Sequence, residues 1–142
     1  MQRHLLSLVG LSLFMSVQAQ VPGYVPSTGL VSWWPFNGNA NDESGTGNDG
    51  VLNGPALTED RFGNSDQAYE FNGTSDYIEI QDDPTLDLET ELSISVWINT
   101  NDFTQPQYII NKSTNGQSDS WLLDLSANPV NESEIRLIIG GL

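Results

Sequence analysis

Short runs of alternating apolar and polar residues, separated by turn residues, constrain the fold of this chain more than any other feature. Residues 91–100, ELSISVWINT, carry Leu, Ile, Val and Ile at positions 92, 94, 96 and 98, which is the two-residue period of a half-buried strand. Similar β-rich runs lie at 29–36, 68–73, 76–80, 107–112, 120–126 and 134–139. No stretch has a convincing helical period. The pattern predicts an all-β protein, built as an antiparallel sandwich.

Asparagine–glycine pairs mark several of the turns between these runs. They begin at Asn37, Asn53, Asn72 and Asn115. Both residue types readily adopt the positive φ angles that tight turns require. Because Asn72 and Gly73 separate two β-rich runs, we expect residues 68–73 and 76–80 to pair as a hairpin.

The first twenty residues, MQRHLLSLVGLSLFMSVQAQ, have the order of a secretory signal peptide. Arg3 and His4 precede an apolar run at 5–15, and small residues lead to Ala19. The run is shorter than the ~20 residues that span a bilayer, and no later segment is apolar enough to cross one. We therefore expect cleavage after Ala19, export to the extracellular space or the cell surface, and a short linker at 20–28 before the domain.

The exported part is strongly acidic and contains no cysteine. Removing residues 1–19 takes away Arg3 and no acidic residue, so the formal net charge changes from −15 to −16. Such a surface repels phosphate backbones and excludes nucleic acid as a partner. An exported domain without disulfides depends on its apolar core, on bound metal, or on both.

The loop FNGNANDESGTGNDG at 36–50 combines four Asn, two Asp, one Glu and four Gly with only one sizeable apolar side chain. An EF-hand register starting at Asn37 requires Gly at the sixth position and Glu at the twelfth, and finds Asp42 and Asn48. The stacked calcium-binding nonapeptide also fails, because only one copy is present. Two interpretations stay open from the residues alone: a solvated polar connection, and an irregular calcium loop that includes Asp42, Glu43, Asn48 and Asp49.

Aromatic residues offer a second kind of candidate site. The alternation of residues 31–36 predicts that Trp34 and Phe36 face the core and Trp33 the opposite side. Aromatic rings in sandwiches mostly serve packing, but a flat amphipathic ring also stacks on a sugar. The candidates for stacking are Trp33, Tyr77, Trp97 and Trp121.

Catalysis by paired carboxylates finds weak support in the sequence. A retaining glycosidase needs two carboxylates ~5 Å apart, which one strand supplies at residues two or four apart. The segment EIQDD, starting at Glu79, has Gln81 in its middle position. Asp87, Glu89 and Glu91 have the right spacing but lie in a turn-like segment. We expect no catalytic residues in this chain.

Three segments together resemble a known family. LVSWWPFNGNANDESGTGNDGVLNG, TEDRFGNSDQAYEFNGTSDYIEI and LSISVWIN look like the laminin-G-like jelly-roll domains of secreted bacterial proteins, within the concanavalin A-like lectin/glucanase group. The resemblance covers residues 29–142. It implies a jelly roll of two antiparallel sheets, calcium at the loop after the first strand, and glycan binding or adhesion. It implies Asp42, Asn48 and Asp49 as the calcium ligands.

The family's closing strands are expected beyond Leu142, and the chain ends on the apolar run EIRLIIGGL. We therefore expect the C-terminal part of the domain to be missing, together with a ligand that it supplies. The expected function is a secreted, non-catalytic and calcium-assisted module that binds a glycan or a cell-surface or extracellular protein, at the N-terminal end of a larger protein. The alternatives are a structural spacer and an accessory domain of a polysaccharide-degrading enzyme.

Overall fold

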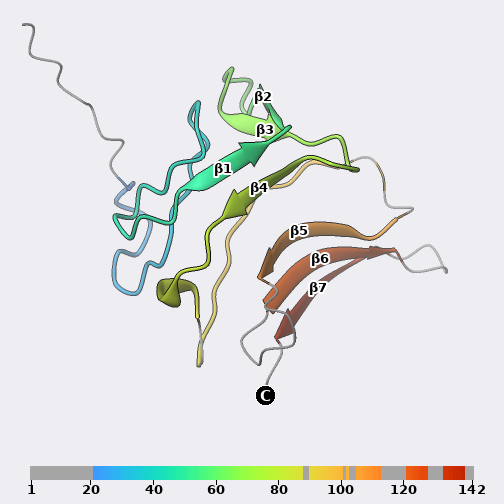
Figure 1. Ribbon diagram of the computed structural model, residues 1–142. Coiled ribbons are helices and arrows are strands. Elements are labelled where there is room, and N and C mark those ends of the chain that lie inside the picture. Colours follow the sequence, from blue (N-terminus) through green and yellow to red (C-terminus); the bar gives the residue numbers. More distant parts are fainter. Residues whose placement is uncertain are drawn as a thin grey trace, which may run out of the picture.

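The computed structural model describes residues 21–87, 90–100, 102, 105–112, 121–127 and 133–139. Its strands are β1 (Gly50–Asn53), β2 (Ala56–Thr58), β3 (Ala68–Glu70), β4 (Tyr77–Ile80), β5 (Gln107–Lys112), β6 (Trp121–Ala127) and β7 (Ser133–Ile139). The short 3-10 helix η1 (Pro84–Leu86) follows β4, and Asp83 caps it by accepting from the Thr85 amide. Every strand pair is antiparallel. The prediction of an all-β, antiparallel protein is confirmed (Figure 1).

One interrupted hairpin contains the first four strands. β1 pairs with β4, with Gly50 opposite Ile80, and β2 pairs with β3, with Thr58 opposite Ala68. Residues 50–58 thus form one arm and residues 68–80 the other, and the hairpin turns at residues 59–67. The predicted hairpin between 68–73 and 76–80 is wrong, because both runs lie on the same arm and each pairs with the arm that precedes them.

The loop at residues 71–76 interrupts this hairpin and shows why the turn signal misled. Gly73 has the positive φ that the Asn-Gly pair indicates, at 73°. The Asn72 side-chain oxygen accepts from the amides of Thr74, Ser75 and Asp76 at 2.9–3.2 Å. These bonds close a compact loop that bulges from one arm. The Asn72-Gly73 pair therefore forms a tight loop as predicted, but this loop is a bulge within one arm and does not reverse the chain.

Gly54, on the opposite arm, leaves room for this bulge. Its φ is 95°, and a Cβ atom there would lie 2.4 Å from Oδ1 of Asp76. We expect Gly54→Ala to lower the free energy of unfolding by about 2–3 kcal/mol, since the strained φ and the clash with Asp76 add together. Urea denaturation measures this loss.

Gly73→Ala is the matched control for that substitution. Its φ is also positive, but nothing lies within 4 Å of the added Cβ position. It should therefore cost only the backbone strain, about 1 kcal/mol. Equal losses in the two variants would show that Asp76 does not pack against Gly54 as described.

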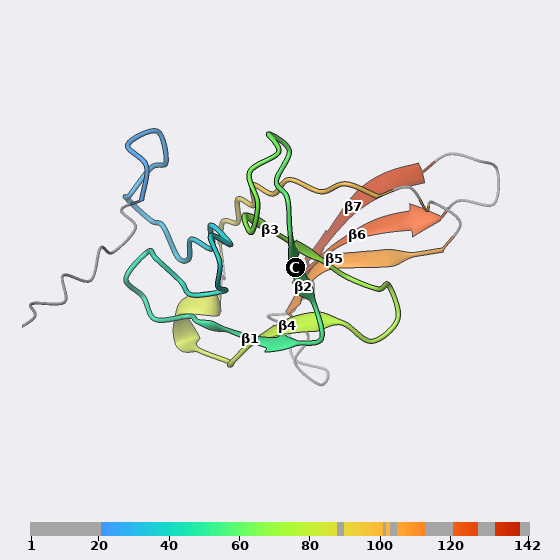
Figure 2. The ribbon, with the colours of Figure 1, turned by 90° about the horizontal axis from the view of Figure 1, so that it is seen from above.

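The second sheet has the order β5-β6-β7 (Figures 1 and 2). The strand predictions for residues 107–112, 120–126 and 134–139 are confirmed within one residue at each end. Trp121, Asp124 and Leu125 of β6 are buried. Asp124 lies directly opposite Arg136 of β7, and the arginine donates to both carboxylate oxygens, at 3.0 and 2.6 Å. The pair neutralises the buried charge.

Two predicted strands, 29–36 and 91–100, have no strand assignment in the structure. Both lack a backbone ladder to any strand of the described residues, and Phe36 ends the first with a positive φ of 58°. The side-chain alternation of the second persists in part, since Leu92 and Ile94 are half-buried between exposed serines. Trp34 and Phe36 are half-buried and not in a closed core; the Phe36 ring packs edge-on against Tyr69 at 5.3 Å.

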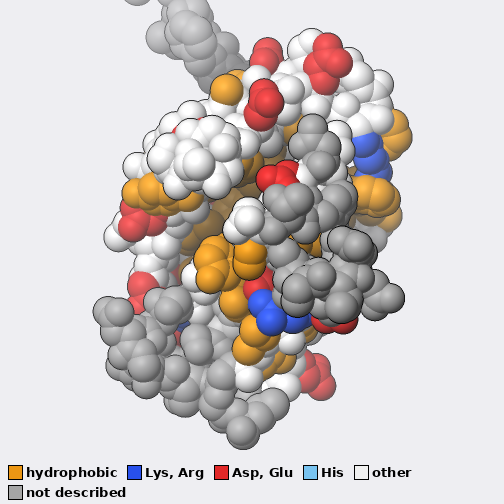
Figure 3. All heavy atoms as spheres, turned by 90° about the vertical axis from the view of Figure 1, so that its right-hand side faces the viewer, with side chains coloured by type: hydrophobic (Ala, Val, Ile, Leu, Met, Phe, Trp, Pro, Cys, Tyr) orange, Lys and Arg blue, Asp and Glu red, His pale blue; other side chains and the backbone are white. Residues whose placement is uncertain are grey.

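Apolar side chains remain open on the outer strand β7. Ile135, Leu137, Ile138 and Ile139 are all exposed. Figure 3 shows apolar side chains in the middle of the molecular face that carries this sheet. The buried apolar side chains among the described residues are those of Ala40, Trp121 and Leu125. Most apolar side chains of the described residues are therefore only partly buried.

Candidate functional site

Asp42 is the centre of the hydrogen bonds within residues 36–50, which we call the asparagine-rich loop. Its Oδ1 accepts from the backbone amides of Trp33 and Ser44, both at 2.9 Å. Its Oδ2 lies 2.9 Å from the Ser44 hydroxyl, 2.6 Å from the Thr46 hydroxyl and 3.1 Å from the Asn48 amide. The Asp42 carboxylate thereby links Ser44, Thr46 and Asn48 of the loop to Trp33, in the segment that precedes the loop.

This environment favours the ionised carboxylate. Partial burial raises the pKa of Asp42, but the hydrogen bonds from Thr46, Trp33 and Ser44 lower it further than burial raises it, to about 2. Asp42 is therefore fully charged at neutral pH.

Asn48 is buried and connects the loop to the rest of the domain. Its backbone carbonyl accepts from the Trp34 indole at 2.7 Å. Its side-chain nitrogen lies 2.9 Å from the Ser32 hydroxyl and 3.0 Å from the hydroxyls of Thr46 and Thr85. Because Thr85 lies in η1, this one side chain joins two segments 37 residues apart.

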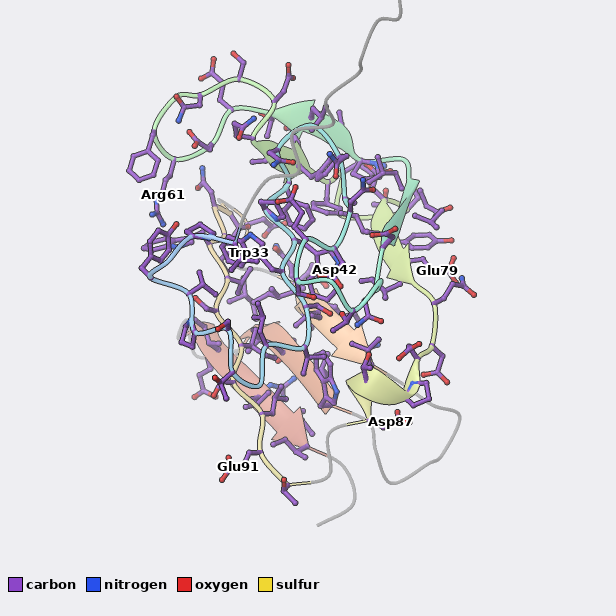
Figure 4. All side chains as sticks on the ribbon, turned by 90° about the vertical axis from the view of Figure 1, so that its left-hand side faces the viewer. Trp33, Asp42, Arg61, Glu79, Asp87 and Glu91 are labelled. Carbon is purple, nitrogen blue, oxygen red and sulfur yellow. The ribbon has the colours of Figure 1, made fainter. Side chains whose placement is uncertain are left out.

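Four oxygen atoms crowd together at the centre of the loop. They are Oδ2 of Asp42, Oγ of Ser44, Oγ1 of Thr46 and the backbone carbonyl of Val31, with distances of 2.6–3.4 Å between them. We call these four atoms the oxygen cluster. In Figure 4, Asp42 lies near the middle of the face that is turned to the viewer, surrounded by other side chains.

The oxygen cluster holds too few protons for its short distances. Thr46 Oγ1 lies 2.6 Å from the Val31 carbonyl and 2.6 Å from Asp42 Oδ2, but its hydroxyl has one proton and can make only one good hydrogen bond. The Ser44 hydroxyl proton can be donated to Asp42. The Asp42 carboxylate has no proton of its own at neutral pH, because its pKa is about 2. One contact between lone pairs at 2.6 Å is therefore left without a proton.

The three predicted calcium ligands lie in this loop but do not form a shared cage. Asp42 belongs to the oxygen cluster. Asn48 directs its nitrogen, and not its oxygen, toward the Val31 carbonyl, at 3.4 Å. Asp49 is exposed, and its Oδ1 accepts from the backbone amide of Asp42 at 2.8 Å. Among the described residues, no three acidic, histidine or cysteine side chains gather into a group suited to a metal.

Glu43, the fourth residue considered for a calcium loop, contacts other neighbours. Its Oε1 accepts from the Asn37 side chain at 3.1 Å, and its Oε2 is buried with no hydrogen-bond partner. The Glu43 amide donates to the Trp33 carbonyl at 2.8 Å. Glu43 therefore helps to fasten the loop to residue 33 and stays outside the oxygen cluster.

The four aromatic candidates lie in different environments. Trp97 is 78% exposed, and the Arg61 guanidinium lies 3.6 Å from the centre of its ring. Tyr77 on β4 is 53% exposed. Trp33 is half-buried, and its backbone binds Asp42 and Glu43. Trp121 is only 8% exposed, so its indole packs inside the domain. Trp97 and Tyr77 thus have rings that a ligand can reach.

The acidic residues considered for catalysis do not converge. Asp87 forms an ion pair with Lys112, which also lies 3.6 Å from Asp82. Glu79 and Glu91 are exposed, and in Figure 4 they lie at separate edges of the molecule. Glu89 lies outside the described residues.

Sequence reasoning missed three members of the oxygen cluster. Ser44 and Thr46 do not stand out in the sequence as candidate ligands, and a backbone carbonyl such as that of Val31 leaves no trace in the residue pattern. The usable signal is the spacing Asp42-x-Ser44-x-Thr46, which places three side-chain oxygen donors within five residues.

Comparisons with known proteins assign no family to this chain. No family model matches it, and no curated protein or solved structure does so either. Among the described residues, no helix is both long and apolar enough to cross a membrane.

Proposed function

We propose that the protein is a secreted, non-catalytic binding module whose asparagine-rich loop is stabilised by calcium and whose ligand is a carbohydrate. The observation that carries this proposal is the oxygen cluster. A carbonyl, a carboxylate and two hydroxyls lie within hydrogen-bond distance of one another, but two hydroxyl protons are too few to make a hydrogen bond at every one of these contacts. A cation removes such a conflict, since it attracts every lone pair at once.

The residues present fit a hard cation such as calcium. Calcium takes six to eight oxygen ligands, accepts backbone carbonyls and hydroxyls, and tolerates irregular geometry. Asp42, Ser44 and Thr46 would hold it together with the Val31 carbonyl, and water would complete the ligand set. A bound ion supplies positive charge that joins residue 31 to the loop. Thr46 is exposed, which leaves the cluster open to solvent and to ions.

Two further arguments support a binding function. The resemblance of residues 29–142 to laminin-G-like jelly-roll domains implies calcium and glycan binding together. The exposed rings of Trp97 and Tyr77 offer the flat apolar surfaces on which sugars stack.

The rival function is a structural spacer that binds no ligand. We expect a glycan array probed with the mature chain in calcium to give binding to at least one class of glycan. Trp97→Ala should weaken this binding, since it removes the exposed flat ring on which a sugar can stack. Trp121→Phe is the control, because a buried ring cannot stack on a sugar. An array without any signal would favour the spacer.

A further inference from the structure

Arg61 and Phe62, at the tip of the interrupted hairpin, form a cluster with Trp97, and the sequence did not single out either of these two residues. Arg61 lies between two aromatic rings, with its guanidinium carbon 4.5 Å from the centre of Phe62 and 3.6 Å from the centre of Trp97. Phe62 is 73% exposed and Trp97 78%. In Figure 4, Arg61 projects from the rim of the molecule, away from Asp42.

The hairpin tip is held in shape before any ligand arrives. Asp60 Oδ1 accepts from the amides of Phe62 and Asn64 at 2.8 and 2.9 Å, and its Oδ2 accepts from the Asn64 side chain at 3.0 Å. Backbone bonds between Asp60 and Asn64 and between Gly63 and Asp60 close the same turn. A ligand at this site therefore loses little affinity to the ordering of the loop.

Arg61 differs from the other basic residues of the described chain. Lys112 is paired with Asp82 and Asp87, and Arg136 with Asp124. Arg61 forms no salt bridge within the described residues, and the carboxylate next to it in sequence, Asp60, already accepts hydrogen bonds from the loop. Its guanidinium lies against two aromatic rings, and none of its N–H groups donates a hydrogen bond within the described residues, so these donors are available to a ligand.

The geometry of this edge selects a planar anion. A carboxylate in the guanidinium plane accepts two parallel hydrogen bonds. It also meets the rims of Phe62 and Trp97, which carry the positive part of the ring quadrupole. A neutral hydroxyl gains neither advantage. The overall charge of −15 disfavours long polyanions but acts weakly on a single carboxylate that is in contact with Arg61.

We propose that Arg61, Phe62 and Trp97 form a binding site for the carboxylate of an acidic sugar, a uronate residue within a glycan. This inference rests on the proposed carbohydrate-binding function and deepens it by naming the sugar class. Arg61 binds the carboxylate, and the exposed surfaces of the two rings contact the apolar face of the sugar or of its neighbour.

The test uses the mature chain and three acidic trisaccharides, of galacturonate, glucuronate and mannuronate, each compared with its neutral methyl ester. Binding is followed by NMR through the indole N–H signal of Trp97, which Trp97→Phe identifies by its disappearance. We expect at least one acid to bind about ten times more tightly than its ester and to shift this signal. The indole signal of the buried Trp121 should not move.

Variants at the site separate binding from folding. Arg61→Met should abolish the preference for the acid, and Arg61→Lys should retain only part of it, because an ammonium cannot make the bidentate contact. Tyr108→Ala removes an exposed ring on β5 that has no part in the proposed binding site, and it should change nothing. The unperturbed signals of the other tryptophans report that each variant is folded.

Three results would overturn the inference: no acid is preferred over its ester, the preference persists in Arg61→Met, or a peptide C-terminal carboxylate binds as tightly as the best uronate. If acids and esters bind equally tightly and Trp97→Ala abolishes the binding of both, the proposed carbohydrate binding is supported and the assignment of an acidic sugar fails.

Discussion

Asp42→Ala is expected to release the asparagine-rich loop from residues 31–34 and to lower the free energy of unfolding by about 3–4 kcal/mol. The reason is that one charged side chain accepts from the amides of Trp33, Ser44 and Asn48 as well as from two hydroxyls. Hydrogen bonds to a charged group contribute ~1.5–3 kcal/mol each, and the donors left without an acceptor find water only in part. Urea denaturation monitored by tryptophan fluorescence measures the loss.

Asp49→Ala is the control, since Asp49 is exposed and its Oδ1 accepts a single hydrogen bond in this loop, from the Asp42 amide. It should cost about 1 kcal/mol or less. Similar losses in the two variants would contradict the central position of Asp42.

Acid titration gives an independent check of the same carboxylate. The pKa of Asp42 in the folded chain is about 2, below its ordinary value of 3.8. Its contribution to stability is therefore present above pH ~4 and is lost as the pH falls toward 2. We expect this part of the acid-induced loss, about 1–2 kcal/mol after allowance for solvent exposure, to be missing in Asp42→Asn.

Arg136→Met is expected to destabilise the β5-β6-β7 sheet more than loss of any other basic side chain in the described residues. The Asp124 side chain is only 2% exposed, and Arg136 donates to both of its oxygens. The hydrogen bonds from Arg136 hold the pKa of Asp124 below its ordinary value. Without the arginine, a buried carboxylate is left charged and unpaired in the middle of β6, which is far more costly than the loss of a surface ion pair.

The double variant Asp124→Leu/Arg136→Met tests that explanation. It removes both charges and fills the same space with apolar atoms, so it should regain much of the stability that the single variant loses. Arg61→Met serves as the control for removal of an exposed arginine. If the double variant has a lower melting temperature than Arg136→Met, the ion pair contributes more to stability than the neutralisation of its two charges.

The strand pattern predicted the fold class, and five of the seven strands, β3 to β7, lie on predicted runs; β1 and β2 do not. The runs at 107–112, 120–126 and 134–139 pair with one another in sequence order, so local pattern and tertiary partner agree. Residues 29–36 and 91–100 have equally good patterns but no ladder partner among the described residues. A β-pattern indicates which face of a segment is apolar; it does not indicate which strand lies beside it.

The sequence pointed to Asp42, the central residue of the candidate site, but not to the residues that contact it. Asp42 stood out because it is a carboxylate among turn residues. Val31 was invisible because it contributes a carbonyl, and Ser44 and Thr46 are small residues common in any loop. Arg61 and Trp97 meet from positions 36 residues apart, with a contact between them that only the folded chain reveals.

The most direct test of the account is the melting temperature of the mature chain with and without calcium. Extracellular calcium sites have dissociation constants of ~10⁻⁴–10⁻³ M, so roughly 10 mM calcium should add about 1.4–2.7 kcal/mol and raise the melting temperature by several degrees. Thr46→Val should lose most of that rise, since it removes one oxygen of the cluster. Thr74→Val removes a hydroxyl that bonds to Asn72 in the bulge loop and should keep the rise. Identical melting curves in calcium and in chelator would contradict the calcium site and leave the loop a polar connection held by Asp42 alone.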